Sequence, residues 1–311
     1  MIEEGVCPVY RKSAVFFVCL LTISIAFTGC RQSPSGQSSS STEAMTEKTF
    51  PVRGKVISTD ATTVMLAHEA IPGFMEAMTM PYKLKDPSII SELHPGDTIT
   101  AVIHVKQDEG GYHDAVLDNI VVVAQARADY KPAKQYHTPE AGDPVPDFRL
   151  LNQNGKTIHL EQFHGKVLVA TFIYTRCPLA DYCPRMSRNF AEIDQTLAKD
   201  PALYQKTHLL SISFDPKYDT PAVLRSYGGA YTGRYTKESF SHWDFAAPPE
   251  NELDKMLEFF GVGVTPGESQ TINHSLSTVV IGKDGKVATW YPTNDWKPED
   301  VVVAIKKAAE A

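Results

Sequence analysis

Cysteine is scarce in this chain of 311 residues, which holds five, at positions 7, 19, 30, 177 and 183. So few cysteines exclude a small scaffold held together by dense disulfides. Net positive charge is also lacking, because 37 acidic residues outnumber 30 basic ones and leave a formal charge of -7. That balance argues against nucleic-acid binding, which usually needs a basic surface. The remaining composition is that of a globular protein, long enough for two domains of ~100–200 residues.

Long apolar runs are missing too, apart from one near the N-terminus, where residues 13–27 carry no charge and follow Arg11 and Lys12. About fifteen residues are too few for a membrane span of ~20 but suit the core of a signal peptide. The run ends at Gly29-Cys30, which resembles the lipobox of bacterial lipoproteins. The resemblance implies a signal peptide over 1–29 and a lipid on Cys30. The alternatives are a plain secretory signal or a retained membrane anchor.

Each of these alternatives exports the folded part, so we expect it in the cell envelope, facing the periplasm or the exterior. The exported chain then keeps two thiols, Cys177 and Cys183, which lie close in sequence in an oxidising compartment. Residues 30–48 are rich in serine and offer almost nothing to a core. This composition predicts a flexible tether between a lipid anchor and the first domain.

A small β domain is predicted over residues 49–124. Five segments rich in β-branched residues alternate partly between apolar and polar positions, as strands do. Turn signals separate them at 71–73, 95–97 and 109–111. Five short strands in so few residues favour a small Greek-key barrel of the OB type.

The chemistry of this domain lies in the run HEAIPGFMEAMTM. Residues two apart on a strand share a face, so Met78 and Met80 project together, with His68 on the strand before. Two thioethers and an imidazole form a soft ligand set that suits Cu(I), and Met75 offers a third sulfur. The alternative is that both methionines only fill the core of the barrel.

The same run resembles the small periplasmic copper-binding domains of Cus-type efflux systems. The resemblance implies that His68, Met78 and Met80 bind one Cu(I) or Ag(I) ion. Those domains also place a tryptophan over the metal, whereas this chain has Phe74-Met75-Glu76 at the equivalent place.

Residues 125–142 are polar and read as an interdomain linker, which leaves a second domain over 143–311. Two nearly continuous apolar runs, 166–175 and 207–214, predict buried strands. An apolar hairpin turns at Lys283-Asp284-Gly285, and helical segments lie between the strands. This order predicts an α/β fold of the thioredoxin-like class.

The cysteine pair follows the first of these buried strands, and Cys183 comes just before a predicted helix near Arg185. A thiol at a helix N-terminus feels the positive end of the dipole, which lowers its pKa and favours the thiolate. Thiolates exchange disulfides and bind soft metals, so the pair suits redox chemistry, copper binding or both. The alternative is a structural disulfide between Cys177 and Cys183.

A third ligand is suggested by His274, in the loop before the hairpin, where a thioredoxin-like fold brings that loop beside the cysteines. Two thiolates and an imidazole suit Cu(I) or Cu(II). The alternative is an ordinary surface histidine. We assign four further histidines to that role: His159, His164, His208 and His242.

Residues 143–303 resemble the Sco/SenC family of copper metallochaperones. The similarity rests on the runs FIYTRCP, CP, SFDP and DTP, and on the histidine before the hairpin. It implies copper binding by Cys177, Cys183 and His274, and delivery to a partner such as cytochrome c oxidase. It also implies disulfide reduction on the partner. Asp215 resembles a family carboxylate placed near the metal, with a turn or helix cap as the alternative.

The chain departs from that family in one respect, because five residues separate its cysteines where three are usual. Loop-closure cost rises slowly with length, so a chelate remains feasible with altered affinity or potential. Two competing functions stay open: a thiol–disulfide oxidoreductase, and a peroxiredoxin-like peroxidase suggested by Thr175-Arg176-Cys177. Two copper sites on one chain also suggest a relay between domains, with its direction left open.

Overall fold

The computed structural model describes residues 46–108, 111–267 and 270–311. The predicted signal peptide, the predicted lipidation site Cys30 and most of the predicted tether lie outside these residues. Within the described part of the chain, no helix is long and apolar enough to cross a membrane.

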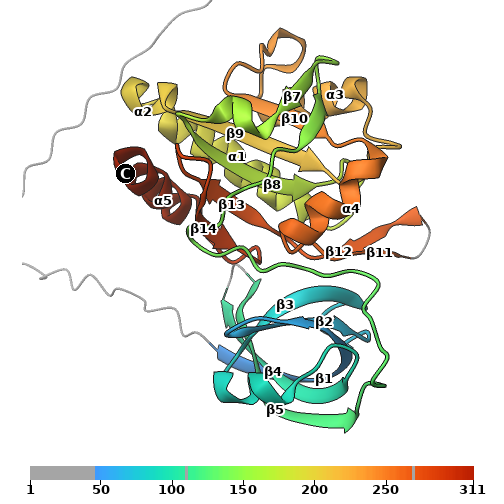
Figure 1. Ribbon diagram of the computed structural model, residues 1–311. Coiled ribbons are helices and arrows are strands. Elements are labelled where there is room, and N and C mark those ends of the chain that lie inside the picture. Colours follow the sequence, from blue (N-terminus) through green and yellow to red (C-terminus); the bar gives the residue numbers. More distant parts are fainter. Residues whose placement is uncertain (1–45, 109–110, 268–269) are drawn as a thin grey trace, which may run out of the picture. The chain divides into compact units, whose positions relative to one another are not determined.

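The first five strands form a closed barrel in the order β1-β2-β3-β5-β4, as predicted (Figure 1). Its β3–β5 pair is parallel and the other pairs are antiparallel. A single 3₁₀ turn, η1 (Pro87–Glu92), interrupts the strands. The strands are β1 (Thr46–Thr59), β2 (Thr63–His68), β3 (Met78–Leu84), β4 (Thr98–Asp108) and β5 (Gly111–Ala124).

The C-terminal part is built on a seven-stranded sheet in the order β14-β13-β8-β9-β10-β6-β7. Its central strands β8 and β9 are parallel, and every residue of both is buried. Such strands need cover on both faces, which explains their unbroken apolar sequences. The sheet comprises β6 (Arg149–Asn152), β7 (Thr157–His159), β8 (Val167–Ile173), β9 (Thr207–Ser213), β10 (Trp243–Ala247), β13 (Thr278–Ile281) and β14 (Val287–Tyr291).

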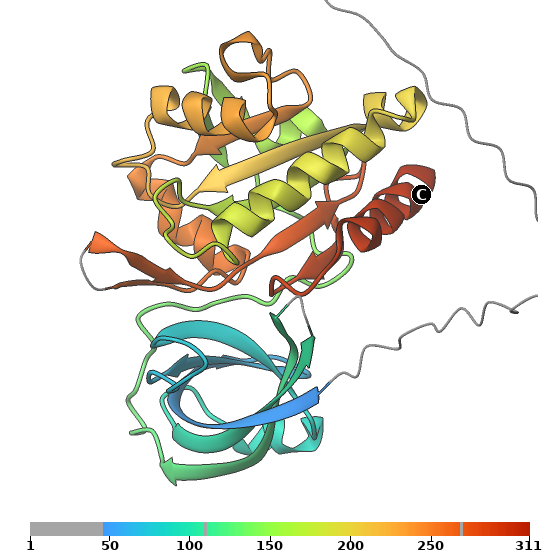
Figure 2. The same ribbon diagram turned by 180° about the vertical axis from the view of Figure 1, so that it is seen from behind.

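Helices supply that cover on the two faces of the sheet. Helix α1 packs against both α3 and α5 on one face, and α4 lies on the other (Figures 1 and 2). The helices are α1 (Cys183–Leu197), α2 (Pro201–Gln205), α3 (Pro221–Tyr231), α4 (Glu250–Phe259) and α5 (Pro298–Glu310), with two 3₁₀ turns, η2 (Leu160–Phe163) and η3 (Tyr235–Lys237). The alternation of strands and helices confirms the predicted thioredoxin-like class.

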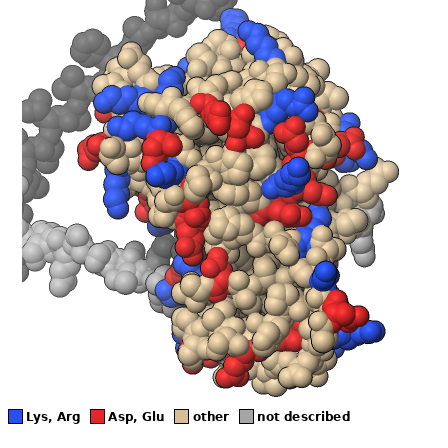
Figure 3. All heavy atoms as spheres, viewed as in Figure 1, with Lys and Arg blue, Asp and Glu red and all other residues tan. Residues whose placement is uncertain are grey.

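Two short strands outside this sheet, β11 (Val264–Pro266) and β12 (Ile272–His274), pair with each other. They precede the β13–β14 hairpin, whose turn places Gly285 at φ 76°, a conformation that favours glycine. On the face shown in Figure 3, basic and acidic side chains are interspersed.

Candidate metal centre

The two cysteines lie where the chain leaves β8 and enters α1. Cys183 is the first residue of α1 and is fully buried, whereas Cys177 is half-buried in the preceding loop. Both are free thiols. Backbone hydrogen bonds from Cys177 to Tyr174 and from Tyr182 to Leu179 shape the loop. The five intervening residues therefore fold into turns and keep the two sulfur atoms close.

His274 completes the cluster from β12. Its Nε2 lies 3.4 Å from Cys183 Sγ, and the three ligand atoms all lie within 4.8 Å of one another. Its Nδ1 lies 2.9 Å from the carbonyl oxygen of Ser275. A proton on Nδ1 satisfies that carbonyl and leaves the Nε2 lone pair directed at the sulfurs. This geometry is ready to bind a soft metal ion.

An aromatic shell surrounds the imidazole of His274, which is 3% exposed. Phe214 lies 4.7 Å away between ring centroids, and Tyr174 and Tyr182 approach edge-on at 5.6 and 5.9 Å. This shell was not predicted, since it unites three separate segments. It holds the ring orientation and limits water access to one side of the cluster.

The two thiols are electrostatically distinct. A side-chain hydrogen bond from Cys183 lowers the pKa of Cys177 to about 4, against the opposing effect of burial. Burial raises the pKa of Cys183. The sequence predicted a lowered pKa for the thiol at the helix N-terminus, and for Cys183 that prediction is wrong. Complete burial outweighs the helix dipole, so the pair rests as one thiolate and one thiol.

A buried carboxylate anchors the loop before Cys177. Asp219 is 1% exposed and accepts hydrogen bonds from the backbone and hydroxyl of Thr175 and from the hydroxyl of Ser213. Burial raises the pKa of Asp219. In the sequence Asp219 stands out only as the first residue of the DTP run, because nothing local shows that Thr175 folds back onto it.

Asp215 acts on the same loop through an arginine. Its Oδ2 accepts a 2.6 Å ion-pair hydrogen bond from Arg176, whose guanidinium stacks 4.2 Å from the ring centroid of Tyr218. Its backbone carbonyl also accepts from Tyr218 and Asp219, as the predicted turn alternative requires. Asp215 therefore contacts the neighbour of Cys177, and its role beside a metal stays a prediction.

The barrel gathers the second predicted ligand set. In the β2–β3 register His68 stands opposite Met78, and Leu66 stands opposite Met80. All three predicted ligands therefore share one face, as the strand periodicity required. They are 3%, 6% and 8% exposed, and both methionines belong to the barrel core. Burial of the sulfurs by itself fits the core-filling alternative as well as a metal site.

His68 adds a further observation on this ligand set. Its Nδ1 lies 2.8 Å from the carbonyl oxygen of Glu69, which assigns the proton to Nδ1. Its Nε2 is buried and has no hydrogen-bond partner among the described residues. Burial lowers the pKa of His68, so the ring is neutral. A buried lone pair without a partner is costly in a core and is what a metal ligand requires.

Met75 lies beside this set, half-buried between the strands. The hydroxyl of Tyr82 contacts its Sδ at 3.5 Å, and the Tyr82 ring meets the His68 ring edge-on. Phe74 stacks on Phe50 with ring centroids 4.5 Å apart, which fixes the loop that carries Met75. The loop therefore brings a third thioether to the mouth of the barrel.

The comparisons with known proteins decide the family. Residues 137–310 match the SCO1/SenC family model. The chain belongs to the SCO1/SenC family. The SCO1 protein homolog of Bacillus subtilis is 30% identical over 169 residues, covering 53% of this chain and 82% of that protein. A SCO2-like protein of Rickettsia felis is 36% identical over 164 residues, covering 51% and 74%.

Two further matches concern the fold and the barrel. The crystal structure of a SCO1/SenC family lipoprotein from Bacillus anthracis has a TM-score of 0.47 at 27% identity, covering 56% of this chain and 99% of that one. Residues 49–114 match the model of the copper binding periplasmic protein CusF. The SCO1/SenC chain therefore carries two copper-binding domains, and copper is their metal.

Two of the histidines assigned to surface loops are buried in this SCO1/SenC domain, so that prediction is wrong for them. His208 and His242 are 5% and 6% exposed, and their rings pair with Asp244 and Asp194. No local pattern reveals this burial, because these pairs join segments more than 30 residues apart. Both histidines are held by carboxylates inside the domain, and neither belongs to the metal-ligand cluster found among the described residues.

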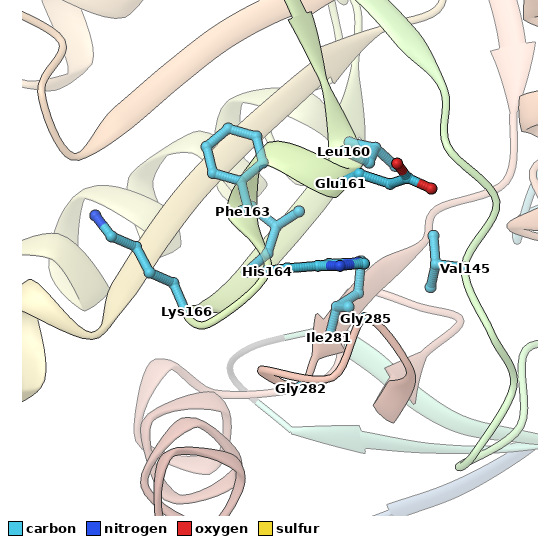
Figure 4. Close-up of a pocket in the computed structure, with 10 residues that line it drawn as sticks. Val145, Leu160, Glu161, Phe163, His164, Lys166, Ile281, Gly282 and Gly285 are labelled. Atoms are coloured by element: carbon cyan, nitrogen blue, oxygen red, sulfur yellow. The ribbon is translucent and has the colours of Figure 1, made fainter.

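His159 and His164 are exposed, as predicted. His164 covers Gly285 at a cavity of about 10 Å³ between η2 and the β13–β14 turn (Figure 4). Such a volume holds about one water molecule. This cavity therefore offers no second ligand site.

Proposed function

We propose that the protein is an exported copper metallochaperone. It binds Cu(I) or Cu(II) through Cys177, Cys183 and His274, and delivers the metal to an acceptor such as the copper centre of cytochrome c oxidase. The observation that carries the proposal is the convergence of three soft ligand atoms within 4.8 Å of one another. Two thiolates and an imidazole match the preferences of copper. Membership of the SCO1/SenC family supports the same metal.

The proposal includes a second, thioether-rich site in the barrel, formed by His68, Met78 and Met80. Neutral thioethers and a neutral imidazole favour Cu(I) over harder ions. The unpartnered Nε2 of His68 and the match to a periplasmic copper-binding family support this assignment. The proposal also places the protein in the cell envelope, held to the membrane by a lipid on Cys30.

The cysteine site can be tested by anaerobic addition of Cu(II) to the chain from Arg31 onward, which keeps every described residue. Thiolate ligation produces a visible charge-transfer absorption. We expect Cys177→Ser, Cys183→Ser and His274→Ala each to abolish or shift it, while His164→Ala, an exposed histidine, leaves it unchanged. An absorption band that survives both cysteine substitutions would exclude this site.

A thiol–disulfide oxidoreductase is the second candidate, favoured by the unequal thiols. The Cys177 thiolate attacks a partner disulfide and forms a mixed disulfide, and Cys183 then displaces the partner as its second thiol. Two electrons pass from the cysteine pair to the partner disulfide, one proton comes from the Cys183 thiol and the other from water, and a Cys177–Cys183 disulfide remains. This function requires both cysteines and survives His274→Ala, so a reductase assay on that variant separates it from copper binding.

A further inference from the structure

The two ligand sets open into the same space. A cavity of about 400 Å³ is lined by Met75 and Met78 of the barrel and by Cys177 and His274 of the SCO1/SenC domain. A second cavity of about 320 Å³ reaches from Met80 to His274. The two cavities share Met75, Met78 and His274 among their walls. The thioethers of Met75 and Met78 and the sulfur of Cys177 therefore line one common volume.

Close backbone packing holds this arrangement. Strand β3 packs against β11 and β12, and Asn273 donates a 3.2 Å hydrogen bond to the carbonyl of Ala77. On another side of the cavities, the backbone of Asp114 donates to Asp295 at 3.0 Å. Gly263 is the tightest point, because a Cβ there would lie 2.0 Å from the carbonyl oxygen of Thr79. Only glycine permits this approach.

We propose that the shared cavity is a transfer chamber, through which Cu(I) passes from the barrel to Cys177, Cys183 and His274 without entering bulk solution. This inference rests on the proposed function, since it needs both sites. It adds the route, the direction and an intermediate ligand. Met75 is that ligand, because it lines both cavities and is less buried than Met78.

The different affinities of the two ligand sets for Cu(I) set the direction of copper transfer. The bonds from copper to His68, Met78 and Met80 break as bonds to Met75, then to the two cysteine sulfurs and His274, form. The Cys183 thiol releases its proton to water, and copper stays Cu(I), so no electron donor is needed. Two anionic thiolates neutralise and hold Cu(I) better than neutral thioethers, which drives the metal toward the cysteines.

The transfer chamber can be tested by measuring how copper divides between the cysteine site and a competing chelator. The chain from Arg31 onward is oxidised to join Cys177 to Cys183, loaded with one equivalent of Cu(I), and reduced by a phosphine beside a colorimetric Cu(I) chelator. A tethered acceptor acts at an effective concentration on the order of millimolar, so a chelator at ~0.1 mM competes poorly. We expect most of the copper to reach the cysteine thiolates, which is measured by their ultraviolet charge-transfer absorption. The fraction of copper that reaches them should stay the same when the protein is diluted at a fixed chelator concentration.

Matched variants sharpen this test. Gly263→Ala disrupts the packing without removing a ligand, and Asp295→Ala removes the acceptor of the Asp114 hydrogen bond, again without removing a ligand. Both variants should lose copper to the chelator, with about tenfold less reaching the cysteines for Gly263→Ala. Gly282→Ala, whose one tight contact would be the flexible Asp284 side chain at 2.9 Å, should behave as the unmodified chain.

Each outcome has a distinct meaning. If the oxidised chain binds no Cu(I), the barrel site of the proposed function is wrong. The chamber is wrong if the oxidised chain binds Cu(I) but both packing variants send the same fraction of copper to the cysteines as the unmodified chain. It is also wrong if dilution lowers that fraction. In both cases the two copper sites themselves remain supported. Met75→Leu should slow transfer and leave the stoichiometry of both sites intact, and equal transfer would remove Met75 from the route.

Discussion

At the scale of single residues, the ligand atoms are prepared by what surrounds them. The two proposed imidazole ligands, His68 and His274, are held alike: Nδ1 lies beside a neighbouring carbonyl oxygen, which leaves the Nε2 lone pair available. Sequence periodicity identified Met78 and Met80, because strand alternation is local. It missed the opposite pKa shifts of Cys177 and Cys183, because burial and hydrogen bonding depend on chain segments far apart in sequence.

The lowered pKa of Cys177 gives a prediction for its alkylation. The thiolate reacts, so reactivity is retained above the pKa of about 4 and is lost as the pH falls through it. In Cys183→Ala the largest stabilising hydrogen bond is gone, and the half-maximal pH should rise. Iodoacetamide labelling of the metal-free chain across pH, mapped by mass spectrometry, measures this.

The wild-type chain provides its own control in that experiment, because buried Cys183 should stay unlabelled. A half-maximal pH for Cys177 near the ordinary cysteine value of ~8.5 would contradict the account.

At the scale of elements, strands and helices were predictable where the signal was continuous. The apolar runs of β8 and β9, the β13–β14 hairpin and the barrel strands all follow local patterns. The contacts that place the Cys177 loop do not, since Asp219 reaches Thr175 across 44 residues. The loop between β8 and α1 is therefore held from the α3 side, through Asp219 and the Arg176–Asp215 pair.

Removing that anchor should cost stability and copper affinity together. Asp219→Ala leaves buried donors of Thr175 and Ser213 without an acceptor, at about 3 kcal/mol in total. Urea unfolding of the metal-free chain should show this loss in the free energy of unfolding. Asp254→Ala removes only a surface ion pair with Lys134 and should cost at most ~1 kcal/mol. Equal stability of the two variants would mean that Asp219 does not hold the loop.

At the scale of the whole molecule, composition predicted two domains, and family resemblance predicted copper for both. The sequence could not show that Met78, Cys177 and His274 line one cavity, because this depends on contacts such as Gly263 against Thr79. The same limit explains why the burial of His208 and His242 cannot be read from the sequence. Local pattern predicts elements and ligand types, whereas burial and juxtaposition come from tertiary packing.

The most direct test of the two-site account is an anaerobic Cu(I) titration of the fully reduced chain from Arg31 onward against a competing chelator. We expect two tight equivalents, with one lost in Cys177→Ser/Cys183→Ser and the other lost in Met78→Leu/Met80→Leu. A single equivalent that does not respond to the cysteine substitutions would contradict the account and leave a copper-binding barrel joined to a redox domain.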